Sequence, residues 1–264
     1  MKRFFNWALT GFALFIFSSC TVTETIVFNE DMGGTFSLGY DLSSMIRMSN
    51  EMDASIDTDE RDFKKMDTVI VFNELFEEYK DSIASLPKEE QLELEKLRGL
   101  TMTIHEDDEK EEFSMTIGKD FETVSELLTI NEQVEQAFKS TMGKDKDKQK
   151  AMGGDMGNMN TELEQAIYTF KGNTFTRHQP KKVQEDTTEP TDEEAFQEPM
   201  DSELDQLTEE SFYIITYSFP KKIKSVSHKD AQISKDGKSF TLSLPWDAVD
   251  KDNALLNLTI ALEK

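Results

Sequence analysis

The sequence predicts an α+β protein in which antiparallel hairpins near both ends of the chain form one sheet, packed against several amphipathic helices. Segments in which β-branched or aromatic residues alternate with polar residues predict the strands. Apolar residues at 3–4 spacing between these segments predict the helices. Charged and Met/Gly-rich stretches predict disordered loops. We expect a single domain over residues 20–264.

The first hairpin is expected over residues 23–40. Thr25–Phe28 is β-branched and aromatic, and Asn29–Gly34 supplies residues that favour a turn. Phe36, Leu38 and Tyr40 then alternate on one face. Further strands are expected at residues 68–72, 100–104, 113–117, 167–170, 174–176, 212–219, 223–226, 231–234, 240–244 and 256–262.

Helices are expected through Met52, with Asp41 or Ser43 as the N-cap, and through Ser85, with Asn73 as the N-cap. A third helix is expected to begin at Pro87 and to end at Gly99, and a fourth over residues 121–138. The segment that begins at Met66 could instead form one continuous helix, in place of the strand at residues 68–72 and the helix after it. Its apolar residues have helical spacing, whereas its β-branched residues favour a strand first. The residues with this spacing are Val69, Phe72, Phe76, Tyr79, Ile83 and Leu86.

The first nineteen residues have the three parts of a secretory signal peptide. Met1–Arg3 is cationic, Phe4–Phe17 is almost entirely apolar, and cleavage is expected between Ser19 and Cys20. A retained membrane anchor is the main alternative, but the apolar run is shorter than the roughly 20 residues that span a bilayer. A buried core helix is a second alternative. We therefore expect residues 1–19 to be removed.

Cys20 is the only cysteine of the chain, so it cannot form an intramolecular disulfide. Phe17-Ser18-Ser19-Cys20 resembles the lipobox that lipoprotein signal peptidase cuts, although Leu, Val or Ile is usual in place of Phe17. Acyl chains on this cysteine would anchor the protein to a membrane. The sequence therefore predicts lipidation of Cys20, with palmitate among its acyl groups.

The chain is strongly acidic. The leader holds two of the 29 Lys and Arg residues and none of the 53 Asp and Glu residues, so the mature chain would have a net charge of −26. Such a surface repels phosphate backbones, which argues against a nucleic-acid partner. The expected partners are the membrane, through the acyl chains, and an envelope protein or lipid.

Two segments are predicted to lack regular structure, a flexible loop at residues 142–162 and an acidic insert at residues 180–200. Four methionines between Met142 and Met159 could bind Cu(I), but no histidine or cysteine accompanies them. Asp57–Asp62 loosely resembles a calcium loop without its central glycine. We expect neither site to form, and no cofactor.

No catalytic motif is evident. His105, His178 and His228 have no second histidine or cysteine at metal-ligand spacing, and we expect them on the surface. The sequence has neither a phosphate-binding loop nor a nucleophile elbow. One basic stretch could meet anionic lipid heads or balance the acidic surface; it consists of Lys221, Lys222, Lys224, Lys229, Lys235 and Lys238.

Several segments resemble an uncharacterised family of Bacteroidota-type lipoproteins. They are Thr25–Met45 after the lipid cysteine, Asp67–Phe72, Asp81–Pro87 and the hairpin Leu100–Phe121. The first hairpin and the block Phe219–Leu262 are similar to the LppM-like lipoprotein domain. The resemblance implies an α+β domain on a membrane and transfers no site residue.

These features predict a lipid-anchored protein of the cell envelope with a binding or scaffolding role and no catalysis. Only Glu24 is acidic just after the cysteine, so the sequence shows no strong signal for export to the cell surface. The favoured location is therefore the outer membrane, facing the periplasm. One alternative is a hydrolase of envelope polymers with paired carboxylates, which would lie in a cleft with raised pKa. Another is a carrier of a hydrophobic ligand, which would show a large apolar pocket.

Overall fold

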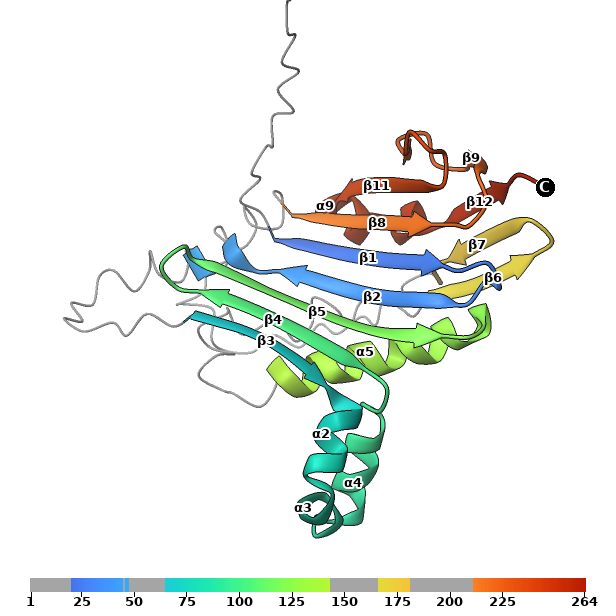
Figure 1. Cartoon of the computed structure of the whole chain (residues 1–264). Helices are drawn as coiled ribbons and strands as arrows, with labels where there is room; N and C mark the ends of the chain where they lie inside the picture. Colours follow the sequence, from blue (N-terminus) through green and yellow to red (C-terminus); the bar gives the residue numbers. More distant parts are fainter. Residues whose placement is uncertain (1–19, 45, 48–64, 143–165, 181–210) are drawn as a thin grey trace, which may run out of the picture.

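An eight-stranded sheet, with a four-stranded sheet and a long helix behind it, forms the frame of the molecule (Figure 1). The computed structural model describes residues 20–44, 46–47, 65–142, 166–180 and 211–264. Their mixture of sheets and helices confirms the α+β class. The expected leader, the calcium-like segment 57–62, most of the loop 142–162 and the insert 180–200 lie outside the described residues, as does the segment 201–210.

The larger sheet joins strands from both ends of the chain. Its order is β10-β11-β8-β1-β2-β5-β4-β3. β1 and β8 are parallel, with Thr21 opposite Phe212, and the other neighbours are antiparallel. The bounds are β1 Thr21–Phe28, β2 Gly34–Asp41, β3 Lys65–Val71, β4 Thr101–Asp107, β5 Glu112–Phe121, β8 Phe212–Ser218, β10 Gln232–Ile233 and β11 Ser239–Pro245.

The larger sheet does join strands from both ends of the chain, as expected, but the last strand lies in a second, smaller sheet that the sequence did not predict. The last strand, β12 (Leu258–Leu262), pairs with β7 (Thr174–His178) and β9 (Ile223–Val226), and β7 also pairs with β6 (Ile167–Lys171). Alternate residues of β12 are buried. A sheet with one apolar face needs a second layer to cover it, and these strands supply that layer over part of the larger sheet.

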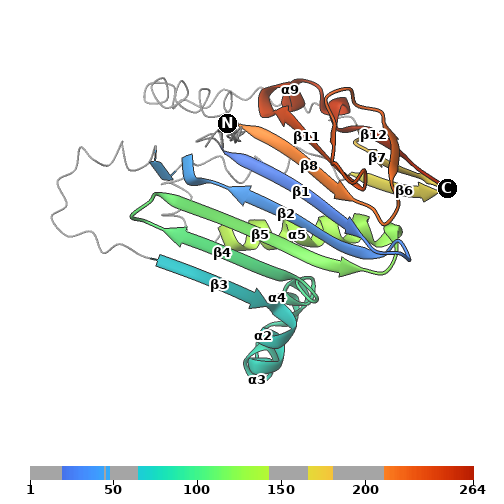
Figure 2. The same cartoon turned by 45° about the horizontal axis from the view of Figure 1, so that its top comes forward.

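The rest of the inner face is covered by α5 (Leu127–Met142), which follows the short 3-10 helix Val124–Glu126 (Figure 2). Its buried residues Leu127, Ile130, Val134 and Ala137 have 3–4 spacing and join the main core. A second 3-10 helix, Asn253–Leu256, and α9 (Trp246–Lys251) connect β11 to β12. In the described part of the chain, no helix has the length and apolar character needed to cross a membrane.

Three short helices project beyond the β3 edge of the larger sheet (Figure 1). They are α2 (Phe72–Glu78), α3 (Lys80–Ala84) and α4 (Lys88–Glu95). Phe72 begins α2 rather than ending a strand. Asn73 does not cap a helix, because its Oδ1 accepts a hydrogen bond from the Gly99 N–H at 2.9 Å. Gly99 has a φ of +83°, a conformation that suits glycine after a helix.

Aromatic residues fill the region where the two sheets meet. Phe175 of β7 is fully buried and lies 5.1 Å from Phe28, 5.7 Å from Tyr217 and 5.9 Å from Phe219 between ring centroids. Phe28 and Phe219 are stacked at 5.0 Å. The two sheets therefore share one core, which fixes the position of the side chains on β1 and β8.

Candidate functional site

Strand β1 separates two kinds of surface. Val22, Glu24, Ile26 and Phe28 are buried on its inner face. The residues between them, Thr21, Thr23 and Thr25, are partly exposed on its outer face. This alternation follows from the two-residue period of a strand. It places a row of hydroxyl groups on one side of β1 and a single buried acid on the other.

The outer face of the larger sheet is rich in hydroxyl groups across several strands. Thr23 lies opposite Gly39 on β2, which lies opposite Thr116 on β5. On the other side of β1, Ile214 and Thr216 of β8 lie opposite Thr23 and Thr25. Hydroxyl side chains on this face of β1, β2, β5 and β8 are those of Thr21, Thr23, Thr25, Thr35, Ser37, Ser114, Thr116, Thr216 and Ser218.

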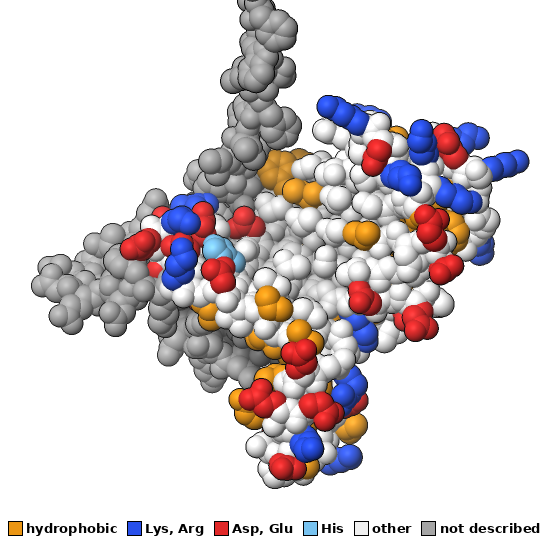
Figure 3. All heavy atoms as spheres, in the orientation of Figure 1, with side chains coloured by type: hydrophobic (Ala, Val, Ile, Leu, Met, Phe, Trp, Pro, Cys, Tyr) orange, Lys and Arg blue, Asp and Glu red, His pale blue; other side chains and the backbone are white. Residues whose placement is uncertain are grey.

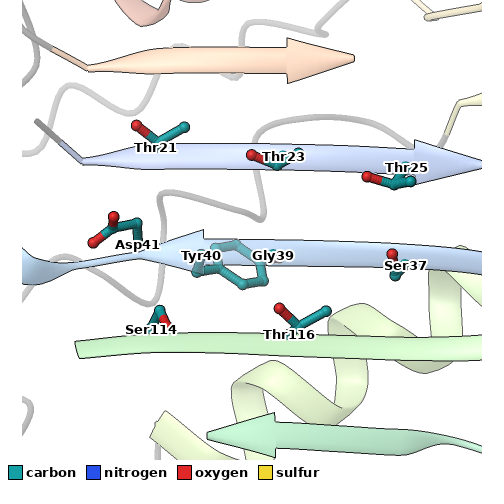
Figure 4. A pocket seen from close by; sticks show the side chains of 9 residues that line it. All are labelled: Thr21, Thr23, Thr25, Ser37, Gly39, Tyr40, Asp41, Ser114 and Thr116. Carbon is teal, nitrogen blue, oxygen red and sulfur yellow. The ribbon is translucent and has the colours of Figure 1, made fainter. Parts of the chain in front are cut away.

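A shallow depression of about 220 Å³ lies at the centre of this face (Figure 4). Gly39 forms part of its floor, since a Cβ atom there would lie 3.3 Å from Thr116 Oγ1. A larger side chain at this position would fill the space between the threonines. The depression is lined by Thr21, Thr23, Thr25, Ser37, Gly39, Tyr40, Asp41, Ser114 and Thr116.

Charged side chains gather at the margins of this face and leave its centre uncharged (Figure 3). At the Asp41 end, His105 on β4 contacts Asp67 (Nδ1 to Oδ1, 2.6 Å) and Glu112 (Nε2 to Oε2, 3.4 Å). Hydrogen bonds to Asp67 and Glu112 raise the pKa of His105 above its usual value. The end of the depression is therefore polar and titratable, whereas its sides carry neutral hydroxyls.

A second polar cluster lies inside the molecule, between the two sheets. Arg177 of β7 donates from Nη2 to Glu24 Oε2 at 2.8 Å and from Nε to Oε1 at 3.2 Å. Three tyrosine hydroxyls also donate to the Glu24 carboxylate: Tyr168 at 2.9 Å, Tyr213 at 2.6 Å, and Tyr217.

The same arginine is held on its other side. Arg177 Nη1 donates to Gln179 Oε1 at 2.9 Å and to the carbonyl oxygen of Leu256 at 3.1 Å. The guanidinium also lies 6.0 Å from the ring centres of Tyr168 and Tyr213. We call Glu24, Tyr168, Arg177, Tyr213 and Tyr217 the buried carboxylate cluster. It joins strands of both sheets.

The surroundings of Glu24 keep it ionised. Burial alone would raise the pKa of Glu24, but the charge of Arg177 and the hydrogen bonds from Arg177, Tyr213 and Tyr217 outweigh it and leave this pKa below its usual value. Burial and the Glu24 charge raise the pKa of all three tyrosines well above the usual range. The tyrosines therefore remain protonated donors.

The Glu24 and Arg177 side chains are each only 2% exposed, so the buried carboxylate cluster is closed to solvent. The sequence interpretation missed it, since it treated Glu24 only as a charge after the cysteine. A signal was present: Glu24 occupies an apolar position in the alternation of Val22, Ile26 and Phe28. A buried acid demands a buried partner.

Cys20, the expected lipidation site, immediately precedes β1 and is 3% exposed. Its Sγ lies 3.0 Å from Ser44 Oγ, and its carbonyl oxygen accepts a hydrogen bond from the Phe212 N–H at 3.1 Å. Ser19 lies outside the described residues.

The other residues that the sequence singled out are dispersed. His105 lies in β4, His178 ends β7, and His228 follows β9. The six lysines of the basic stretch are all exposed. Within the described ranges, no group of three or more His, Cys, Asp or Glu residues is arranged to hold a metal ion.

Five described carboxyl groups have a pKa below the usual value. In four of them, a neighbouring side chain lowers the pKa by donating a hydrogen bond to the carboxylate. The pairs are Arg98 to Glu95, Lys65 to Asp107, Thr123 to Glu126 and Ser234 to Asp236. The pKa of Glu24 is lowered as well. A general acid in glycoside hydrolysis needs a raised pKa, so these five groups do not suit that role.

Comparison with known proteins assigns the chain to no family. No protein-family model matches the sequence, and no curated protein does. Among solved structures, the folded domain of LppM from Mycobacterium tuberculosis, determined by NMR, aligns with a TM-score of 0.38 and 8% identity. The alignment covers 93% of this chain and 90% of that domain. The resemblance to a Bacteroidota-type family gains no support from these comparisons.

Proposed function

We propose that this chain is a lipid-anchored protein of the bacterial cell envelope with a binding role and no catalytic activity. The observation that carries the proposal is the position of Cys20. It follows an apolar run with a cationic start, it is the only cysteine, and it directly precedes β1. Acyl chains on Cys20 would hold the larger sheet at the membrane surface without a long tether.

The binding role is supported by the outer face of the larger sheet. This face combines a depression, a neutral hydroxyl lining and partly exposed apolar residues on β8. The buried carboxylate cluster and the aromatic core stand behind it and keep β1 and β8 in place. A rigid support of this kind suits a binding surface, since ordered groups lose little freedom when a ligand binds.

The anchoring is tested with the full chain expressed in a bacterial host, followed by detergent phase partitioning. The natural chain should enter the detergent phase and run as a processed band. Cys20→Ala should remain unprocessed, and globomycin should have the same effect on the natural chain. Ser44→Ala is the matched control, because it removes the contact to Sγ and leaves the thiol in place.

Two results would contradict the anchoring. One is a Cys20→Ala chain that is processed and partitions like the natural chain. The other is a natural chain whose processing is indifferent to globomycin. Either result would remove lipidation from the account and leave the outer face as an unanchored surface.

A further inference from the structure

We propose that the depression on the outer face of β1, β2 and β5 binds a neutral carbohydrate chain. The inference deepens the proposed binding role and rests on it for its biological setting. It depends on three features: the hydrogen-bonding groups of the depression, its lack of cationic residues and the apolar strip beside it.

The hydrogen-bonding groups match those of a sugar. Thr21, Thr23, Thr25, Ser114 and Thr116 each present a hydroxyl, which both donates and accepts. Strand geometry spaces such groups about 4.8 Å apart between strands and roughly 6.8 Å apart along a strand. A sugar ring carries several hydroxyls of the same dual character, and a chain of rings presents them along its length. A ligand lying over this face could therefore exchange several hydrogen bonds with it.

The depression has no cation to recognise an anionic ligand. None of its lining residues is Lys or Arg, and Asp41 is its one acidic member. Recognition of phosphate or carboxylate normally uses Arg, Lys or a helix N-terminus. The chain as a whole has a net charge of −24, which repels anionic polymers. Charge complementarity therefore favours a neutral glycan over a nucleic acid, a phospholipid head group or an acidic polysaccharide.

An apolar strip runs along the depression on the β8 side. Phe212 lies opposite Thr21, and Ile214 lies opposite Thr23. Both side chains are partly exposed on the same face as the threonines. Sugar rings have C–H surfaces as well as hydroxyl edges, so a ring over β1 could place hydroxyls on the threonines and C–H groups on Phe212. A fatty acyl chain would offer no hydrogen-bonding partner to the hydroxyls of Thr23, Thr25 and Thr116.

The polar end of the depression could bind the end of the carbohydrate chain. Asp41 Oδ1 accepts hydrogen bonds from the Ser43 N–H at 3.1 Å and from Ser43 Oγ at 2.6 Å, which fixes its carboxylate. A fixed carboxylate can accept from sugar hydroxyls. His105, Asp67 and Glu112 lie at this same end of the face.

The test measures binding of three neutral probes, cellohexaose, maltohexaose and chitohexaose, to the full chain in a detergent without sugar head groups. Calorimetry or ligand-observed NMR at roughly millimolar concentration covers the affinity expected for such ligands. A heparin hexasaccharide serves as the anionic probe. We expect at least one neutral probe to bind and the anionic probe not to bind.

Matched variants then locate the site. Thr23→Val combined with Thr116→Val replaces two hydroxyls by methyl groups of similar shape and should weaken binding about tenfold or more. Thr241→Val makes the same change on β11, outside the lining residues, and should leave the affinity unchanged. Thermal unfolding of each variant confirms that it folds.

Failure of all three neutral probes to bind would overturn the inference. So would preferential binding of heparin, or neutral binding that the double variant and the β11 control change equally. These outcomes are separate from the anchoring test, because a chain can be acylated at Cys20 without binding glycans. Conversely, glycan binding by a chain that is not acylated at Cys20 would support the carbohydrate site and exclude the membrane anchor.

Discussion

Arg177 Nη2 lies 2.8 Å from Glu24 Oε2, and this ion pair joins β7 of the smaller sheet to β1 of the larger one. Each side chain is 2% exposed. Three tyrosines satisfy the remaining hydrogen-bonding capacity of the carboxylate. Because both charges are buried and paired, the removal of either one leaves the other without compensation.

Glu24→Gln should therefore lower the free energy of unfolding by about 3–5 kcal/mol, because the Arg177 guanidinium keeps its charge in a buried site. Denaturant unfolding followed by circular dichroism measures the change. The matched control is Glu95→Gln, which removes an exposed ion pair with Arg98 and should have little effect. Equal stability of the two variants would show that the buried carboxylate cluster does not hold the sheets together.

The stability conferred by Glu24 should depend on pH on the acid side. The pKa of Glu24 is lowered in the folded state, so the folded chain binds this proton less readily than the unfolded chain. The contribution is present above the ordinary value of 4.5 and is lost as the pH falls from there through the folded-state pKa. The difference in unfolding free energy between the natural chain and Glu24→Gln should shrink along this range. A difference that grows towards acid would contradict the assignment.

Tyr217→Phe should cost about 1–3 kcal/mol of stability, because it removes a hydroxyl that donates to a buried carboxylate. Loss of this donor should also raise the pKa of Glu24 and move the acid-side loss of stability to higher pH. Tyr79→Phe is the control, since Tyr79 is 49% exposed on the projecting helices. Chemical denaturation at several pH values measures both effects. A Tyr217→Phe chain as stable as Tyr79→Phe would exclude this role for the hydroxyl.

His105 should titrate above its ordinary pKa of 6.5, because Asp67 and Glu112 both hydrogen bond to its ring. NMR of the imidazole resonances gives the value directly. Asp67→Asn should move the pKa back towards its ordinary value, and Glu112→Gln should do so to a smaller degree, since its contact is longer. A His105 resonance that titrates identically in the Asp67→Asn variant would contradict this geometry.

Local patterns predicted the class of the fold and the position of much of the secondary structure. Alternation of Phe36, Leu38 and Tyr40 predicted a strand with one buried face, and these residues are buried on β2. The pairing of distant strands could not be predicted in this way, because alternation states which face is buried and not which strand lies beside it. β1 beside β8 and β12 beside β7 are such cases.

The candidate sites illustrate the same limit. Thr21, Thr23 and Thr25 could be expected on one face of a strand, but their alignment with Gly39 and Thr116 depends on the register of two further strands. Glu24 could be recognised as an acid at a position where the strand alternation predicts an apolar residue. Its partners lie about 140 residues or more away in sequence, so their identity required the three-dimensional structure.

The most direct measurement of the central claim is mass spectrometry of the N-terminal peptide of the natural protein, isolated from membranes of its own cells. The account predicts a peptide that starts at Cys20, with a mass increased by a diacylglyceryl group on the sulfur. A peptide that runs continuously from the leader through Ser19 into Cys20 and Thr21, with a free thiol, would contradict it.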